Sequence, residues 1–387
     1  MAVIKLLMCL FVIGCRAQGI SKADLFLQQH LPPPTTQPPA VTKNSCVLND
    51  QSKGRCVKPT QCLKTRDEIE LSTTGVNRDQ TCFYLMLCCP LDQIKVTEVV
   101  TAPPAQKKLG CGWSNDGIAF RTNTEGQAGY GEFPWMVALI KKSNDQDDWV
   151  QRDYVGGGTL IHPSVVMTAA HKLKPLKFQP SLVICRLGEW DTQITNEQYP
   201  HEDQDVKKII VHENFNSKTN AFNIALLITK SEFDLSYPNT RIACLGRSLP
   251  QPGTNCHGMG WGQQLHKLME YAISLKKVSV PIVDRGDCEI SLQQAPVLGP
   301  RFRLDRTHMC AGGRRQDTCQ GDGGSPLVCK ISQPGSDADR FSVYGMAAFG
   351  IDCSGNYPGV YVDVTRMIDW ISGQFQNEGL DAKTFQE

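Results

Sequence analysis

A chain of 387 residues exceeds what one hydrophobic core usually organises, so two folded units joined by connecting segments are expected. Lys and Arg number 40 against 39 Asp and Glu, a balance that gives no reason to expect nucleic acid or a membrane surface as a partner. The 17 cysteines, many of them closely spaced, favour an oxidising compartment and a disulfide framework.

The first residues have the pattern of a secretory signal peptide. Lys5 precedes an apolar run over residues 6–14, and small residues flank Arg16, so cleavage is expected after Ala17. The run is too short to span a bilayer, which needs about 18 apolar residues, and no other stretch approaches that length. We therefore expect a signal peptide at residues 1–17 and a secreted protein without membrane insertion.

A proline-rich arm is predicted at residues 18–45, and a cysteine-rich segment follows at residues 46–89. Six cysteines lie in that segment, with nine, five, nineteen, five and no residues between them: Cys46, Cys56, Cys62, Cys82, Cys88 and Cys89. Such a short segment needs covalent cross-links, because its apolar content cannot offset the chain entropy lost on folding. Spacing does not choose among the fifteen pairings of six cysteines. Zinc is disfavoured because the segment contains no histidine.

Residues 90–110 are expected to form a second linker, with Pro103, Pro104 and the dibasic pair Lys107 and Lys108. In the remaining part, residues 111–387, short apolar segments alternate with clusters of Gly, Pro, Asn and Asp, which is typical of an all-β barrel or sandwich. These segments are residues 135–140, 165–169, 209–211, 224–228 and 344–349. Apolar residues at helical spacing from Val364 to Phe375 predict a closing amphipathic helix, with Asp363 as its N-cap.

Three motifs in this part resemble those of trypsin-like serine proteases. Residues 166–171 resemble the segment that ends in the catalytic base, residues 222–227 the segment with its carboxylate, and residues 317–329 the nucleophile loop. His171 is retained, but Asn223 stands where the family has aspartate and Gly323 where it has serine. The resemblance implies a trypsin-like double β-barrel with a C-terminal helix. The degenerate triad predicts a pseudo-protease, because glycine offers no nucleophile and an amide cannot stabilise an imidazolium.

The resemblance also implies two vestigial features of the cleft. Asp317, Gly350 and Gly359 match the pocket for an Arg or Lys side chain, and Gly321 and Gly323 match the oxyanion hole. The alternative of a protease with rearranged catalysis through Ser325 requires that side chain to reach the nucleophile position. Ser325 lies two residues beyond that position, next to a proline, so its side chain is expected to point away.

Activation and metal binding depart from the family pattern as well. Active relatives are cleaved after a basic residue, and the new terminal ammonium pairs with the aspartate before the nucleophile, here Asp322. Cleavage after Arg121 would expose Thr122, which does not suit the apolar pocket that receives Ile or Val. No cofactor is expected to be required. A short acidic loop resembles the family's calcium loop, so Ca²⁺ is the metal to test there. Its candidate ligands are Glu189, Asp191 and Glu197.

Two family patterns imply the cysteine pairing. The segment at 46–89 resembles the clip domain that precedes the protease domain of many arthropod haemolymph proteases, which implies the pairs Cys46–Cys88, Cys56–Cys82 and Cys62–Cys89. The protease resemblance implies the pairs Cys111–Cys244, Cys256–Cys329, Cys288–Cys310 and Cys319–Cys353. The family's disulfide beside the catalytic histidine is replaced by Gly156 and Lys172. Cys185 is left unpaired, as a free thiol, an intermolecular bridge or a small buried residue on a strand.

Together these features resemble a clip-domain serine protease homologue. That resemblance implies a non-catalytic cofactor or regulator of an extracellular immune protease cascade, namely prophenoloxidase activation and melanisation, in a haemolymph-like fluid. The implied partners are a clip-domain protease, prophenoloxidase or both. A second hypothesis stays open, namely a protein that recognises or adheres to microbial surfaces.

Overall fold

The computed structural model describes residues 45–48, 53–57, 87–90, 93, 110–115, 126–143, 149–193, 197–264, 267–313, 322–332, 339–351 and 355–387. Contacts divide the chain into two units, residues 1–98 and residues 99–387. The predicted signal peptide and the arm up to residue 44 lie outside the described residues. None of the helices in the described ranges combines the length and the apolar character needed to cross a membrane.

The first unit contains a small antiparallel sheet with the strand order β1-β2-β3. Its strands are β1 (Ser45–Val47), β2 (Lys53–Val57) and β3 (Leu87–Pro90). In this register Cys56 lies opposite Cys88. Cys88 and Cys89 are each disulfide-bonded, and Cys89 is fully buried. Cys62 and Cys82 lie outside the described residues, so the three pairs implied for this segment stay predictions.

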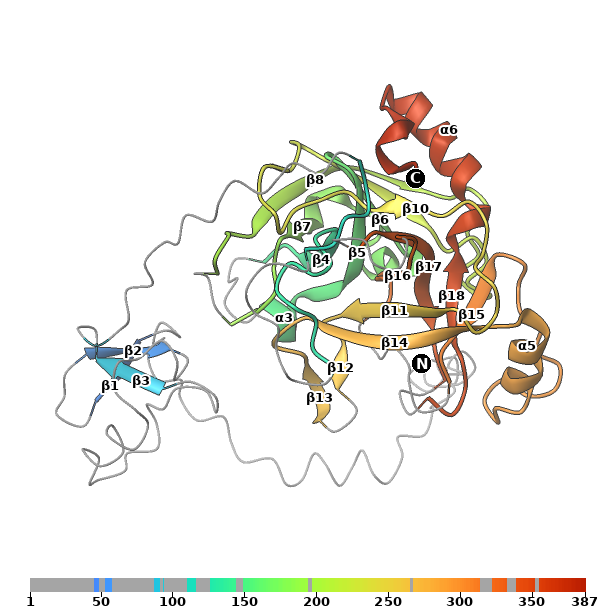
Figure 1. Ribbon diagram of the computed structural model, residues 1–387, viewed down its shortest axis with the longest axis horizontal. Helices are drawn as coiled ribbons and strands as arrows, with labels where there is room; N and C mark the ends of the chain where they lie inside the picture. The colour runs from blue at the N-terminus through green and yellow to red at the C-terminus, as the bar shows by residue number, and fades with distance from the viewer. Residues whose placement is uncertain are drawn as a thin grey trace, which may run out of the picture. The chain divides into compact units, whose positions relative to one another are not determined.

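The second unit begins with a closed antiparallel barrel in the order β4-β5-β6-β9-β8-β7 (Figure 1). Its strands are β4 (Met136–Lys141), β5 (Tyr154–His162), β6 (Val165–Thr168), β7 (Val183–Leu187), β8 (Glu202–Val211) and β9 (Ala225–Thr229). Four of the apolar segments predicted as strands fall in β4, β6, β8 and β9. β4 and β6 are buried along almost their whole length, which explains their continuous apolar sequence. The short helix α4 (Ala170–Leu173) follows β6 and carries His171.

A second sheet has the order β10-β17-β16-β11-β14-β15-β18. Its strands are β10 (Cys244–Leu245), β11 (Asn255–Gly260), β14 (Lys276–Val283), β15 (His308–Ala311), β16 (Pro326–Lys330), β17 (Phe341–Phe349) and β18 (Gly359–Asp363). Because β17 also pairs with β18, six of these strands close into a ring, and β10 adds to β17 in parallel. Smaller elements surround the barrels: α3 (Trp149–Arg152), β12 (Gln263–Gln264), β13 (Lys267–Tyr271) and α5 (Arg285–Gln293). The predicted all-β class and double barrel are confirmed.

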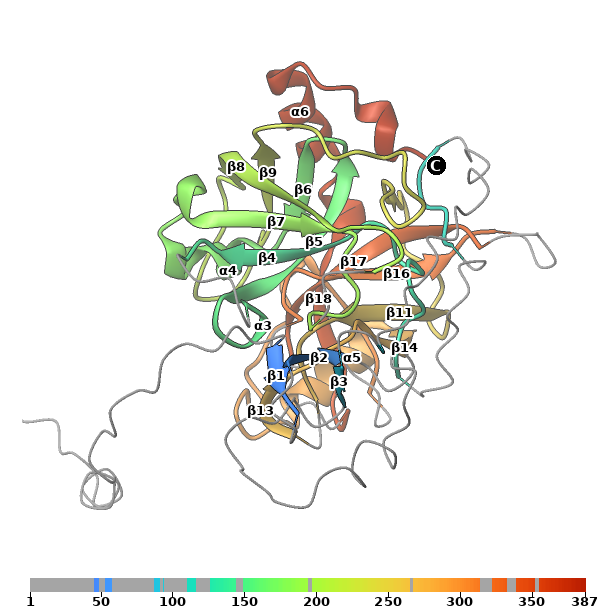
Figure 2. The ribbon, with the colours of Figure 1, turned by 90° about the vertical axis from the view of Figure 1, so that its left-hand side faces the viewer.

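The predicted closing helix is present, but it starts later than its cap suggested. Asp363 accepts a hydrogen bond from the Thr365 backbone N–H at 3.1 Å and caps a 3₁₀ turn, η5 (Val364–Arg366). The α-helix itself is α6 (Ile368–Glu378), which buries Phe375 and ends at Gly379 with a φ of 70° (Figure 2). A last turn, η6 (Ala382–Phe385), packs the Phe385 ring against Phe375 at a centroid distance of 5.1 Å.

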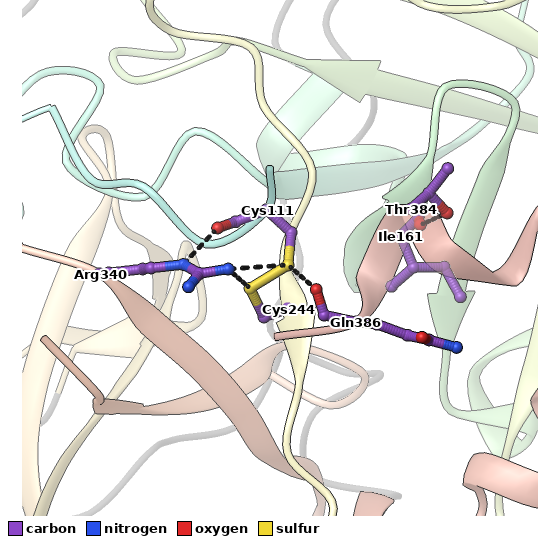
Figure 3. Close-up of a disulfide and its surroundings, with 6 residues drawn as sticks. All are labelled: Cys111, Ile161, Cys244, Arg340, Thr384 and Gln386. Atoms are coloured by element: carbon purple, nitrogen blue, oxygen red, sulfur yellow. Dashed lines mark hydrogen bonds between the residues drawn. A yellow bond between two sulfur atoms is a disulfide. The ribbon is translucent and has the colours of Figure 1, made fainter. Parts of the chain in front are cut away.

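Among its described residues, the second unit has three disulfides: Cys111–Cys244, Cys256–Cys329 and Cys288–Cys310. All three are pairs that the family resemblance implied, whereas Cys319 and Cys353 lie outside the described residues. Figure 3 shows that the first bridge lies beside Gln386 of the C-terminal tail. Arg340 Nε donates to the Cys111 carbonyl at 3.0 Å, and the Gln386 carbonyl oxygen lies 3.1 Å from Cys111 Sγ. The bridge therefore ties a segment that precedes Arg121 firmly to β10.

Candidate functional site

The three triad positions come together although they lie far apart in the sequence. His171 is on α4 after β6, Asn223 precedes β9, and Gly323 lies in the turn before β16. Asn223 Nδ2 lies 2.8 Å from His171 Nδ1. A Cβ atom built on Gly323 would lie 3.1 Å from His171 Nε2. The geometry of a base beside a nucleophile position is therefore present, with no side chain at residue 323.

Hydrogen bonds of Asn223 determine which ring nitrogen of His171 carries the proton. The Asn223 Oδ1 atom accepts a hydrogen bond from the His171 backbone N–H at 2.9 Å, which orients the fully buried amide. Its Nδ2 group is then the donor toward His171 Nδ1, so that nitrogen is the acceptor. In a neutral imidazole the proton must then be on Nε2. His171 thus presents a hydrogen-bond donor toward residue 323, where a protease needs a base.

The environment of His171 also keeps the ring uncharged. Its pKa is lowered to about 4, chiefly by burial and in addition by the charge of Lys172, and the hydrogen bond of Asn223 opposes this shift only in part. The Asn223 amide has no charge with which to stabilise an imidazolium, unlike an aspartate. At neutral pH the ring is therefore a fixed, neutral donor.

We expect ¹⁵N NMR to find the His171 ring with its proton on Nε2 at neutral pH and a pKa near 4. This pKa lies below the unfolded-state value of about 6.5, so the unfolded chain takes up the proton first as the pH falls. The contribution of His171 to stability is therefore complete above pH ~6.5 and is lost between pH ~6.5 and ~4. A His171→Gln variant should lack this part of the acid destabilisation. Protonation of Nδ1 at neutral pH would contradict the assignment.

Ser325 does not point toward the position that a nucleophile would occupy. Its side chain is 1% exposed, and a Cβ atom built on Gly157 would lie 2.0 Å from its Oγ. The hydroxyl thus packs against the backbone of β5, and it finds no hydrogen-bond partner among the described residues. This packing matches the expected direction of the side chain.

Replacing Ser325 by alanine should leave stability unchanged or raise it by about 1 kcal/mol, because the variant no longer buries an unpaired hydroxyl. Thr168→Val is the matched control, because the Thr168 hydroxyl donates to the Gly157 carbonyl at 2.7 Å. That variant should lose about 1 kcal/mol in denaturant unfolding. Equal losses in both variants would show that Ser325 makes a hydrogen bond of similar worth.

Gly156 and Lys172 stand at the two positions that the resemblance assigns to a disulfide, and the Lys172 side chain fills the space between them. A Cβ atom on Gly156 would lie 2.5 Å from both Lys172 Cε and the Gly323 carbonyl oxygen. A Cβ atom on Gly323 would lie 3.0 Å from Lys172 Cδ. Burial lowers the pKa of the Lys172 ammonium, and the negative charge of Asp322 opposes this effect. Packing of the aliphatic stem thus takes the place of a covalent link beside His171.

The predicted basic-residue pocket and oxyanion hole are only partly within the described residues. Gly350 is exposed at the end of β17, and Gly359 is buried at the start of β18. Asp317 and Gly321 lie outside the described residues, so both features stay predictions.

The acidic loop holds an arginine where the resemblance suggested calcium. Glu189 is 5% exposed, and its Oε2 atom lies 3.3 Å from Arg186 Nη1. Arg186 also pairs with both carboxylate oxygens of Asp203, at 2.7 and 2.8 Å. Burial raises the pKa of Glu189 to about 7, opposed by Arg186. The described residues contain no group of three or more His, Cys, Asp or Glu side chains that could hold a metal ion. Calcium binding at Glu189, Asp191 and Glu197 stays a prediction. Titration calorimetry at millimolar Ca²⁺ tests it, and the absence of binding would contradict it.

Cys185 is a free thiol in the middle of β7. It is fully buried between Leu139 of β4 and Gln204 of β8, and burial raises the pKa of the thiol. Such a thiol is unreactive and packs as a small apolar side chain.

One residue of the site was missed by the sequence reasoning. Lys276, the first residue of β14, lies with its Nζ atom 3.3 Å from Asp322 Oδ2. Its neighbour Lys277 pairs instead with Glu132 at 2.6 Å. No local signal separates these two lysines, so the contact with Asp322 could be found only in the folded structure.

Comparisons with known proteins identify the family of this chain and several of its relatives. The family model described as Trypsin matches residues 124–371. The chain is 42% identical over 301 residues to phenoloxidase-activating factor 2 from Galleria mellonella, covering 74% of this chain and 96% of that protein. It is 33% identical to the inactive CLIP domain-containing serine protease A28 from Anopheles gambiae, over 78% of this chain and 80% of that protein. It is 35% identical to the inactive protease A8 of the same type and organism, over 76% and 78%.

Proposed function

This chain belongs to the trypsin family of serine proteases and their homologues, and from that premise we propose that it is a secreted, non-catalytic cofactor or regulator of an extracellular protease cascade. The cascade is the one that activates prophenoloxidase. Its direct partners are proteins, namely a clip-domain protease, prophenoloxidase or both. The relatives named as a phenoloxidase-activating factor and as inactive CLIP proteases support this choice of cascade and of role.

The observation that carries the proposal is the hydrogen bond between Asn223 and His171. The Asn223 amide donates to His171 Nδ1, and this fixes a donor at Nε2 beside a residue without a side chain. Acyl transfer by a serine enzyme needs a hydroxyl at residue 323 and an imidazole that accepts its proton. Neither requirement is met, and Ser325 is packed against β5 instead. A protein with this cleft contributes to a cascade through binding.

Reconstitution tests the role directly. The purified protein, intact or cut after Arg121, is added to prophenoloxidase with an activating protease, and phenoloxidase yield is measured. We expect at least one of the two forms to change the yield relative to the protease alone. The same yield with and without the protein, in both forms, would contradict the proposal. Omitting the activating protease is the control, and it should give no phenoloxidase.

A further inference from the structure

The carboxylate of Asp322 is buried and needs a positive partner. Asp322 is 2% exposed, and its Oδ1 atom accepts a hydrogen bond from the Gly262 backbone N–H at 2.8 Å. Its Oδ2 atom lies 3.3 Å from the ammonium of Lys276, which also donates to the Gln263 carbonyl at 3.3 Å. A buried carboxylate is costly unless it is both hydrogen-bonded and paired with an opposite charge, and here it is both.

The surrounding backbone is shaped to receive this carboxylate. Gly260, the last residue of β11, pairs with Lys276 across the ladder and has a φ of 155°. A Cβ atom on Gly260 would lie 2.2 Å from Asp322 Oδ1, so a side chain there would push the carboxylate away. The turn also depends on Asp322, because its carbonyl accepts a hydrogen bond from the Ser325 N–H at 2.9 Å. The position of Asp322 therefore determines where Gly323 lies relative to His171.

Residues 126–128, which follow the expected cleavage point by five residues or more, lie beside Lys276 in the uncut chain. The Ala128 N–H donates to the Leu275 carbonyl at 2.8 Å, and the Lys277 N–H donates to the Gly126 carbonyl at 2.9 Å. Gln127 pairs with Lys276 itself. While the chain is uncut, the nitrogen of Thr122 is part of a peptide bond and carries no charge. The side chain of Lys276 therefore already supplies an ammonium within ion-pair distance of Asp322 before any cleavage.

We infer that Lys276 is a positioning residue that substitutes for a new terminal ammonium and holds the turn at residues 322–325 in its final form in the uncut protein. Cleavage after Arg121 then does not reset this turn. If cleavage regulates the protein, it acts through other parts of the chain. This inference concerns the conformation of the turn and does not depend on the cofactor role, so either can fail without the other.

Hydrogen exchange in the full chain, with the cysteines oxidised, tests the inference at the amides of Gly262 and Ser325. Lys276→Met should speed exchange at both amides at least tenfold, because the buried carboxylate loses the ammonium with which it forms an ion pair. Lys277→Met is the matched control. It removes a lysine of the same length that is ion-paired with Glu132, and it should leave both amides as in the wild type. Lys276→Arg keeps the charge and should preserve most of the protection.

A second hydrogen-exchange experiment uses only the wild-type sequence, and it tests the inference even if Lys276→Met does not fold. Exchange at the same two amides is compared before and after cleavage after Arg121. The inference predicts equal protection in the two forms. A tenfold gain in protection on cleavage would overturn it, since a new terminus would then be ordering the turn. Unchanged exchange in a folded Lys276→Met variant would overturn it as well.

Discussion

Replacing Asn223 by aspartate in a chain that already carries Gly323→Ser is expected to raise the hydrolysis of Arg and Lys esters by about 10⁴-fold, the factor that a wrong tautomer costs a serine protease. An aspartate would accept the hydrogen bond from Nδ1–H and move the proton off Nε2. It would also raise the pKa of His171, because a carboxylate stabilises the imidazolium. A serine side chain at residue 323 would begin 3.1 Å from Nε2, which brings its hydroxyl within reach of the base.

The two single variants are the controls for this experiment. Gly323→Ser alone and Asn223→Asp alone should stay near the background rate, because the members of a triad act as a unit. The Lys172 side chain would lie 3.0 Å from the new Cβ atom and must shift slightly, so the double variant is also made with Lys172→Ala. Folded double and triple variants without activity would show that the cleft lacks more than these two groups. Ester hydrolysis by the wild type, abolished by Ser325→Ala, would contradict the proposed inactivity.

Removing the bridge between Cys111 and Cys244 with two serines should lower the free energy of unfolding by about 5 kcal/mol in the uncut chain. The bridge closes a loop with a sequence separation of 133 residues, and long loops gain most from a cross-link. Once the chain is cut after Arg121, this bridge is the covalent link between the two pieces, because Cys111 precedes the cut and Cys244 follows it. The N-terminal piece should then separate from the barrel unit under non-reducing conditions. Denaturant unfolding and non-reducing electrophoresis measure the two effects.

The bridge between Cys288 and Cys310 provides the matched control. Its sequence separation is only 22 residues, so its removal should cost about 3 kcal/mol. Both of its cysteines follow Arg121, so the cut pieces should stay together in that variant. A cut Cys111→Ser and Cys244→Ser protein that also stays together would show that contacts other than the disulfide hold the N-terminal piece.

The fold could be predicted largely from local patterns. Apolar runs bounded by Gly, Pro and Asn indicated β4, β6 and β9, because strands in a closed barrel are buried on both faces or nearly so. The start of the last helix was predicted less well. Asp363 is a cap, but it caps a 3₁₀ turn, and a side-chain cap does not distinguish the first turn of an α-helix from that turn.

The candidate site could be predicted at those positions where the residue type alone decides the chemistry. The substitutions at Asn223 and Gly323 are visible in the sequence, and so is the paired change at Gly156 and Lys172. Side-chain orientation was not predictable. The tautomer of His171 follows from two hydrogen bonds of one amide, and the partner of Asp322 is a lysine 46 residues away in the sequence. Such contacts depend on how the strands pair, which local sequence does not specify.

The most direct test of the central claim is phenoloxidase yield in the reconstituted mixture with wild-type protein and with His171→Ala. If the cleft contributes no chemistry, the variant should give the same yield as the wild type, because binding does not need the imidazole of His171 as a catalytic base. Circular dichroism and the melting temperature verify that the variant is folded. A fall of the yield to that of the activating protease alone, with the variant folded, would contradict a role without catalysis.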